Sequence, residues 1–186
     1  EETARAFAEV GARIVCVARS AAQIKDTVSA IEDQGGEGLA VACDLTEAGS
    51  ADEVVGRAVE RFGAVDILVN NVYQIPSPPA MGKGFWEHPI SVWDDQCGVG
   101  LRGYYVASVF AAPLMVRQKQ GLIVNISSRG GREYVFSASY GVGKAAVDRM
   151  AQDFAVELKD YNVTAVSLSP SKVKTEFILD MLAQGK

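Results

Sequence analysis

Short apolar runs alternate with helix-like segments along almost the whole chain, and this alternation strongly constrains the fold. The runs, rich in Val, Ile and Ala, are expected to form strands at residues 12–18, 39–43, 65–69, 122–126 and 163–168. The segments between them are expected to form helices at residues 1–10, 21–34, 50–62, 92–118 and 138–159. Such strands, buried on both faces and separated by helices, indicate a parallel sheet with helices on each side. The sequence therefore predicts an α/β fold with a doubly wound parallel sheet in three layers, α/β/α.

Local signals place several helix ends. Gly11 is a plausible stop for the first helix, and Ser50 with Glu53 forms an S-x-x-E capping box that predicts a helix start at Ser50. The chain opens without methionine, directly in a helical pattern, and closes with a helix-like segment at 177–186 and no final strand. We therefore expect residues 1–186 to be a single domain and a fragment of a longer chain, whose missing termini could hold targeting or membrane-anchoring signals.

Composition narrows the possible partners. With 186 residues and 48% hydrophobic content, the chain can form one domain with a substantial core. Its net charge of −5 argues against nucleic acid as a partner. An odd number of cysteines, without a CxxC pair, fits the cytoplasm or another reducing compartment. The apolar stretch 106–116 is too short to span a bilayer, and a single histidine, His88, gives almost no support for a metal site.

Polar residues follow every predicted strand at the point where the strand ends. In a doubly wound sheet, ligands bind in the crevice outside the carboxyl ends of the strands. Any one of these residues could be a turn or cap residue, but five convergent strand ends are hard to explain by core packing. The residues in question are Arg19, Asp44, Asn70 with Asn71, Ser127 with Ser128, and Pro170.

A tyrosine and a lysine lie four residues apart in the helix expected at 138–159. Residues at i and i+4 share one face of a helix, so Lys144 is expected beside Tyr140, where its charge would stabilise the phenolate. The phenol then becomes a usable acid or base nearer neutral pH. A hydroxyl from Ser127 or Ser128 could hydrogen-bond a substrate carbonyl that Tyr140 protonates. The set suits carbonyl reduction, although the same spacing also occurs in simple surface pairs.

These motifs together resemble the short-chain dehydrogenase/reductase family over essentially the whole chain. Residues 85–87, 93–95, 98–103 and 140–146 are most similar to the subgroup named dehydrogenase/reductase family member 1. The motifs that carry the family resemblance are Asp44-Leu45, the run VDILVNN at 65–71, Ile126-Ser127-Ser128, the Y-x-x-x-K set, and Pro170 with Thr175.

The resemblance implies a Rossmann-like fold, a nicotinamide cofactor and a role for each matching residue. Tyr140 corresponds to the general acid/base, Lys144 to the residue that activates it and holds the nicotinamide ribose, and Ser128 to the residue that orients the substrate. Ser127 is the alternative for the serine role. The matching cofactor-binding residues are Arg19, Asp44, Leu45, Asn70, Asn71, Tyr140, Lys144, Pro170, Val173 and Thr175.

The chain departs from the family pattern in four places. The family's first strand and glycine-rich phosphate loop would precede Glu1, and the C-terminal strand would follow Lys186, so the sheet is expected to lack both. The segment 98–103 spells G-x-G-x-x-G, but no strand precedes it, so we expect its glycines to allow close helix packing. Gly100 replaces the family's helix asparagine, where a water could substitute. Val72-Tyr73 replaces the usual glycine after Asn71, and Pro170-Ser171 replaces Pro-Gly.

Arg19 bears on the choice of cofactor. A cation after this strand would accept the additional phosphate of NADP, whereas an acid would bind the ribose hydroxyls of NAD, so NADP(H) is favoured and NAD(H) remains possible. Asp44 resembles the family residue near the adenine. For Arg19 the alternative is a solvated surface residue, and for Asp44 it is a turn with Thr46.

The resulting hypothesis is an oxidoreductase that transfers a hydride between nicotinamide and a ketone, aldehyde or alcohol. Four aromatic residues, Phe85, Trp86, Phe136 and Phe177, suggest an apolar small molecule as substrate, although aromatic residues are often part of a core. The alternative is a cofactor-binding interaction or regulatory protein with impaired catalysis, because Tyr73, Gly100 and Ser171 depart from the family pattern. The helices at 92–118 and 138–159 resemble those that form family homodimers and homotetramers.

Overall fold

The computed structural model describes residues 1–76 and 82–170 together with residues 173, 179 and 183. Apart from residues 179 and 183, the helix expected at 177–186 lies outside the described residues, and so do Thr175 and Phe177. The predicted alternation of strands and helices is confirmed along the described part of the chain.

Within the described residues, five strands form two parallel sheets. In one sheet, β1 (Ile14–Ala18) pairs with β2 (Gly38–Ala42), with Ile14 opposite Gly38. In the other, β4 (Gly121–Ile126) lies between β3 (Ile67–Asn70) and β5 (Val163–Leu168). The parallel arrangement was predicted correctly. No described strand pairs with both β1 and β3, so the two parts of the parallel arrangement are not joined within the described residues.

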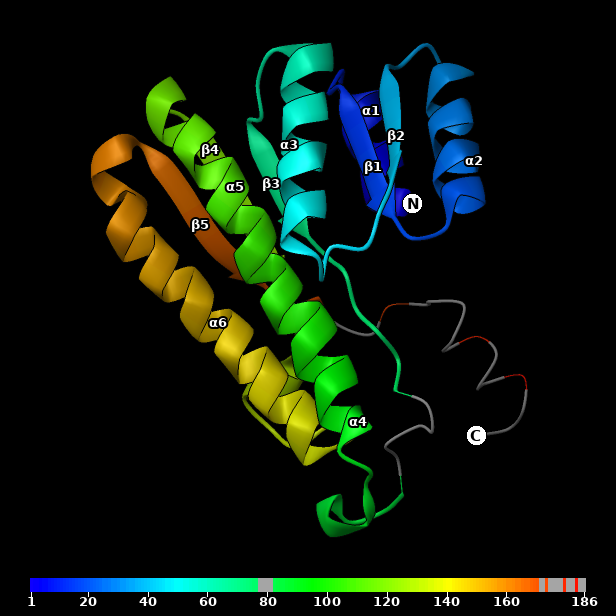
Figure 1. Ribbon diagram of the computed structural model, residues 1–186, viewed down its shortest axis with the longest axis vertical. Helices are drawn as coiled ribbons and strands as arrows, with labels where there is room; N and C mark the ends of the chain where they lie inside the picture. The colour runs from blue at the N-terminus through cyan, green and yellow to red at the C-terminus, as the bar shows by residue number, and fades with distance from the viewer. Residues whose placement is uncertain (77–81, 171–172, 174–178, 180–182, 184–186) are drawn as a thin grey trace.

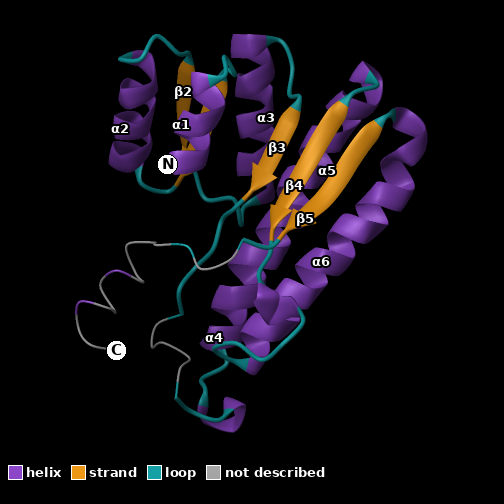
Figure 2. Ribbon diagram, turned by 180° about the vertical axis from the view of Figure 1, so that it is seen from behind, coloured by secondary structure: helices purple, strands orange, loops and turns teal. Residues whose placement is uncertain are grey.

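Helices flank the strands (Figures 1 and 2), but no described helix lies in front of β3, β4 and β5 in Figure 2, so the described helices cover these three strands on one face only. Helices α1 (Glu2–Glu9) and α2 (Ala21–Glu32) pack on the first sheet around a core of Cys16, Ile24, Val28 and Ile31. Helices α3 (Ala48–Phe62), α5 (Arg102–Gln118) and α6 (Ala138–Leu158) lie in front of the strands in Figure 1. The second core joins α5 and α6 to the second sheet and comprises Ala111, Met115, Ile123, Leu158, Val163 and Ala165.

The start of α3 corrects the predicted capping box. The helix begins at Ala48 with Glu47 as N-cap, so Ser50 lies inside its first turn, and its N–H donates to the Glu47 carbonyl at 3.1 Å. The earlier start follows from the preceding turn, where the Asp44 carboxylate accepts from the Thr46 N–H at 2.9 Å. The helix ends as expected for a glycine C-cap, at Gly63 with φ of 85°.

The helical region predicted at 92–118 is continuous but contains a π-helical segment. It consists of α4 (Ser91–Trp93), η2 (Asp94–Leu101) and α5. It is 28 residues long and contains an 18-residue stretch with a mean hydropathy of 1.3, so it is long and apolar enough to cross a membrane by length and composition alone, which the sequence argument from residues 106–116 missed. Tyr104, Ala111 and Met115 are buried in the domain, so the helix packs as a core helix does.

All three cysteines are free. Cys16 and Cys97 are buried and Cys43 is half-buried. Burial raises the pKa of each thiol, which keeps the protonated form dominant near neutral pH.

Candidate active site

The carboxyl ends of β3, β4 and β5 point the same way in Figure 2, toward α4. Arg19 follows β1 and Asp44 lies two residues beyond β2, where the ladder continues through a Cys43 N–H bond to the Ala18 carbonyl. Asn70 ends β3, Ser127 and Ser128 follow β4, and Pro170 lies two residues after β5. The fold therefore brings the polar strand ends to one side, as the topology argument predicted.

The two serines after β4 differ in what their hydroxyls contact. Ser127 is buried at 3% exposure and its Oγ donates to the backbone carbonyl of Lys144 at 3.3 Å, which ties β4 to α6. Ser128 is half-buried, and its Oγ accepts from the Gly130 N–H at 3.2 Å, so its hydroxyl hydrogen is not committed to this bond. Ser128 is therefore the serine whose hydroxyl can donate to a ligand.

Tyr140 lies in the first turn of α6, where Ser137 is the N-cap and accepts from the Tyr140 N–H at 3.2 Å. The tyrosine is buried at 9% exposure. Two aromatic rings meet it edge to face, Tyr73 at 5.9 Å and Phe136 at 5.2 Å between ring centroids. On another side the backbone of Gly130 approaches closely, because a Cβ at this glycine would lie 2.5 Å from Cε1 of the ring.

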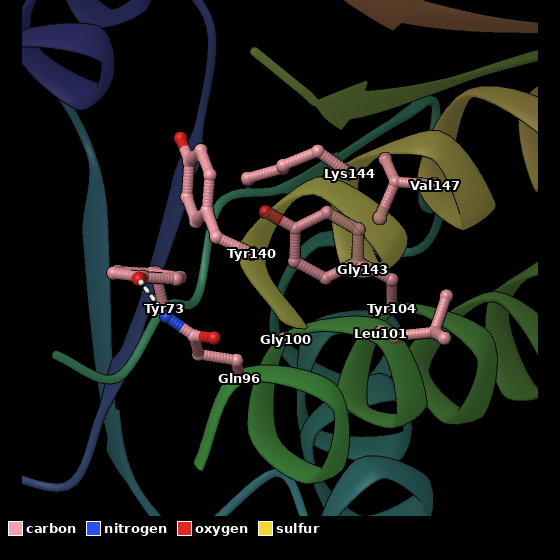
Figure 3. A pocket seen from close by; sticks show the side chains of 9 residues that line it. All are labelled: Tyr73, Gln96, Gly100, Leu101, Tyr104, Tyr140, Gly143, Lys144 and Val147. Atoms are coloured by element: carbon pink, nitrogen blue, oxygen red, sulfur yellow. Dashed lines mark hydrogen bonds between the residues drawn. The ribbon is translucent and has the colours of Figure 1, made fainter. Parts of the chain in front are cut away.

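Lys144 lies one turn further along α6, and its ammonium group reaches back toward β4. Its Nζ donates to the Ile126 carbonyl at 2.9 Å, and the same carbonyl accepts from the Tyr104 hydroxyl at 3.2 Å. Burial lowers the pKa of Lys144 to about 8, and the negative charge of Asp148 opposes this shift. Lys144 and Tyr140 line one small cavity of about 10 Å³, room for about a single water molecule (Figure 3).

Charged groups also gather beyond β1 and β2. The Asp44 carboxylate accepts from the backbone N–H and the hydroxyl of Thr46, at 2.9 and 2.8 Å. These bonds, with a smaller contribution from the Arg19 charge, hold the pKa of Asp44 below its usual value. Arg19 itself is exposed. Arg102 extends from the start of α5 and donates to the Thr46 carbonyl, which places a second cation near this turn.

The predicted asparagine pair is divided between the interior and the surface. Asn70 is buried, and its Nδ2 donates to Asn125 Oδ1 at 2.9 Å and to Ser108 Oγ at 3.1 Å. Its side chain therefore links β3 to β4 and α5, whereas Asn71 is exposed. Among the other predicted cofactor residues, Leu45 is half-buried, Pro170 and Val173 are exposed, and Thr175 lies outside the described residues.

The G-x-G-x-x-G segment lies within the long helix, where its glycines allow close packing. A Cβ at Gly103 would lie 3.3 Å from Cγ1 of Val72 and 3.9 Å from the Leu45 carbonyl oxygen. A Cβ at Gly100 would lie 3.7 Å from the Val72 carbonyl oxygen. The contacts agree with the packing role expected for these glycines.

A polar network beside Tyr140 was not predicted. Gln96, buried in the π-helical segment, donates from Nε2 to the Tyr73 hydroxyl at 3.4 Å (Figure 3). Its Oε1 accepts from Ser137 Oγ at 3.3 Å and from Ser139 Oγ. The sequence signalled Tyr73 as a departure from the family pattern, but no motif indicated Gln96.

Several large aromatic side chains are exposed. Phe85 and Trp86 are 68% and 76% exposed and contact each other edge to face, with ring centroids 5.3 Å apart. Phe136 is 42% exposed and also contacts the Tyr140 ring. Phe136 therefore adds apolar surface next to Tyr140, while Phe177 lies outside the described residues.

Known proteins resemble the chain in sequence and fold. The family model described as short chain dehydrogenase matches residues 1–184. Dehydrogenase/reductase SDR family member 1 from Mus musculus and from Homo sapiens are each 41% identical over 181 residues, which cover 95% of this chain and 57% of each relative. The chain therefore spans less than two thirds of the length of these relatives.

Two solved structures share the fold at comparable coverage. A short-chain dehydrogenase/reductase from Burkholderia xenovorans has a TM-score of 0.88 at 30% identity, over 98% of this chain and 71% of that one. A metagenomic short-chain oxidoreductase in complex with NADP has a TM-score of 0.80 at 28% identity, over 97% of this chain and 82% of that one. Together with the sequence matches, they confirm the predicted resemblance and the Rossmann-like α/β fold.

Proposed function

Since the chain belongs to the short-chain dehydrogenase/reductase family, we propose that it forms the catalytic part of an NADP(H)-dependent oxidoreductase that interconverts a carbonyl compound and its alcohol. The observation that carries the proposal is the convergence of Ser128, Tyr140 and Lys144 at the carboxyl ends of the strands. A Cβ at Gly130 would lie 2.5 Å from the Tyr140 ring and 3.6 Å from Ser128 Oγ, so the two hydroxyl-bearing residues flank one glycine.

Each of the three residues has one chemical task in this proposal. Ser128 donates its free hydroxyl hydrogen to the substrate oxygen and fixes the orientation of the carbonyl. Tyr140 gives its phenolic proton to that oxygen as negative charge develops there, and it accepts the proton when the alcohol is oxidised. The ammonium charge of Lys144, one turn away, stabilises the phenolate that remains.

The residues around the crevice fit a dinucleotide. One N–H of the Lys144 ammonium donates to the Ile126 carbonyl, which leaves two N–H groups that can donate to ribose hydroxyls. Exposed Arg19 offers a guanidinium to the additional phosphate of NADP, and half-buried Asp44 lies on the adenine side. A bound nicotinamide would supply or accept the hydride. The proposed further contacts are Leu45, Asn70, Asn71, Pro170, Val173 and Thr175.

We propose a predominantly apolar small molecule as substrate. The Phe136 ring, in contact with Tyr140, and the exposed pair Phe85 and Trp86 offer apolar surface to such a compound. The relative bound to NADP supports the cofactor class, and the exposed Arg19 supports NADP over NAD.

We further propose a homodimer or homotetramer in the cytoplasm or another reducing compartment. Helices α5 and α6 carry large apolar side chains that are about half exposed or more, namely Tyr105, Val109, Val142 and Val156. Burial of such side chains against a second copy is favourable.

The test is NADPH oxidation by the full-length protein across a panel of ketones, aldehydes and quinones, beside the variant Tyr140→Phe. The proposal expects turnover by the wild type and loss of about 100-fold or more in the variant, with NADPH still bound. Equal turnover by both proteins would contradict the role of Tyr140. NADPH binding without turnover in either protein would instead support the cofactor-binding, catalytically impaired alternative.

A further inference from the structure

Tyr73 contacts both members of the tyrosine–lysine pair. Its ring meets the Tyr140 ring edge to face at 5.9 Å, and the Lys144 ammonium lies 5.6 Å from the Tyr73 ring centroid. Although the side chain is 39% exposed, its position is fixed from below by the hydrogen bond from Gln96 (Figure 3). Tyr73 therefore lies where its ring can influence the charge of Lys144 and the orientation of Tyr140.

Gln96 connects three segments that are distant in sequence. It lies in the π-helical segment, and its amide reaches Tyr73 in the loop after β3. It also reaches Ser137, the N-cap of α6, and Ser139 in the first turn of that helix. Because Gln96 is only 5% exposed, these bonds are shielded from water and define one arrangement of the three segments.

Lys144 is a buried cation with few compensating groups. The titratable groups that face it are Tyr73 from the loop after β3, Tyr104 from α5, and Tyr140 and Asp148 from its own helix. From β4 it meets the Ile126 carbonyl. Two of these neighbours, Tyr73 and Tyr104, present ring faces to the ammonium at 5.6 and 6.0 Å, within the range of a cation–π interaction.

We propose that Tyr73 and Gln96 are positioning residues for the active site: Gln96 anchors Tyr73 to the start of α6, and the anchored Tyr73 ring stabilises the charged form of Lys144 and holds the Tyr140 ring in place. This inference rests on the proposed function of Tyr140 and Lys144. It gives Tyr73, which replaces the family's glycine, a positioning role at Tyr140 and Lys144.

The ring and the hydroxyl of Tyr73 are tested separately. Tyr73→Leu removes the ring but keeps an apolar side chain, whereas Tyr73→Phe keeps the ring and removes only the hydroxyl. Activity that needs charged Lys144 falls as pH rises through its pKa, which is about 8. Without the ring the charged form loses stabilisation, so the alkaline limb of kcat/KM in Tyr73→Leu should move down by about 0.5 pH unit or more. In Tyr73→Phe, which keeps the ring but loses the hydrogen bond from Gln96, that limb should move less than in Tyr73→Leu.

Gln96→Leu tests the anchor, and Gln74→Leu is its matched control. Gln74 also joins the loop after β3 to the π-helical segment, through a 2.8 Å bond from Nε2 to Asp95 Oδ1, but no contact places it at Tyr140. Gln96→Leu should lower kcat several-fold with an unchanged KM for NADPH, and Gln74→Leu should leave kcat within about twofold of wild type. In the double variant of Tyr73→Leu and Gln96→Leu, the fold loss of kcat should be smaller than the product of the losses in the two single variants.

One readout needs no turnover. The pH dependence of Lys144 acylation by acetic anhydride, followed by peptide mass spectrometry, reports its pKa directly. The inference would be overturned if Tyr73→Leu had the same alkaline limb of kcat/KM and the same Lys144 acylation profile as the wild type. It would also be overturned if Gln96→Leu and Gln74→Leu lost kcat to the same extent. Absent turnover in the wild type would contradict the proposed function alone, since the acylation profiles of Tyr73→Leu and Tyr73→Phe would still decide the role of the ring.

Discussion

The substitution Gly130→Ala adds a single methyl group between the two proposed hydroxyl donors. The new Cβ would lie 2.5 Å from Cε1 and 2.8 Å from Cδ1 of Tyr140, well inside an ordinary van der Waals contact. The φ angle of Gly130 is not positive, so alanine meets no backbone strain there, and the effect comes from the contact. The variant therefore tests whether the position of the Tyr140 ring matters for catalysis.

The expected magnitude follows from the space that must open. The ring has to move by about 1 Å to restore a normal contact, and a misplacement of about 1 Å can cost about 100-fold in rate. Phe136 and Tyr73 contact other parts of the Tyr140 ring, so it cannot move freely. Overpacking should also lower the free energy of unfolding by about 1–3 kcal/mol.

The assay is kcat/KM for NADPH-dependent carbonyl reduction, with NADPH binding and denaturant unfolding measured on the same preparations. Gly56→Ala is the control, because it lies in α3 with no atom within 4 Å of the added Cβ. This control should keep wild-type activity and gain about 0.5–1 kcal/mol in the free energy of unfolding. Wild-type kcat in folded Gly130→Ala would refute the reasoning.

Three further predictions concern charge, cofactor and core. Lys144→Met should abolish turnover yet raise the free energy of unfolding near pH 7 by up to about 3 kcal/mol, because burial lowers the Lys144 pKa from 10.5 to about 8 and so disfavours its charged form. In the wild type, the cost of burying the charged lysine disappears as pH rises from about 8 to 10.5. The difference in unfolding free energy between Lys144→Met and the wild type should therefore shrink over that range, and a difference that stays constant would contradict the prediction. Arg19→Ala should raise the KM for NADPH about tenfold and leave the KM for NADH unchanged. Equal changes in the two KM values would show that Arg19 does not recognise the additional phosphate. Met115→Ala, at a position with 0% exposure, should cost about 2–5 kcal/mol in denaturant unfolding with unchanged kcat, whereas a loss below 1 kcal/mol would mean that the core collapses around the gap.

The elements that the sequence predicted best are those whose residues satisfy local and tertiary preferences together. β5 occupies Val163–Leu168, the predicted range, because β-branched residues favour a strand and because Val163 and Ala165, at alternate positions, are buried in the second core. The helix that carries Tyr140 was also predicted correctly. Ser137 is a strong N-cap, and Val147, Ala151 and Leu158 are buried on one face of the helix. In both cases the local pattern and the packing agree.

The errors arose where a tertiary contact or a side chain decided the local structure. Ser50 has the sequence of a capping box, but the turn held by Asp44 and Thr46 allows α3 to begin earlier. The π-helical segment was not predicted, because its eight residues are too few to show a periodicity distinct from that of the α-helix around them. Gln96 could not be found as a site residue, since its partners lie in two segments that are both far from it in the sequence, the loop with Tyr73 and the start of α6.

Two departures from the family pattern lie next to each other in space. Gly100 stands where the family has an asparagine, and Tyr73 belongs to the Val72-Tyr73 pair that replaces the family's glycine. A Cβ at Gly100 would lie 3.7 Å from the Val72 carbonyl oxygen, which is an ordinary van der Waals contact, so this part of the helix faces the backbone next to Tyr73. The Tyr73 ring in turn contacts Tyr140 and Lys144. We therefore expect the longer side chain in Gly100→Asn to extend toward the loop that carries Tyr73.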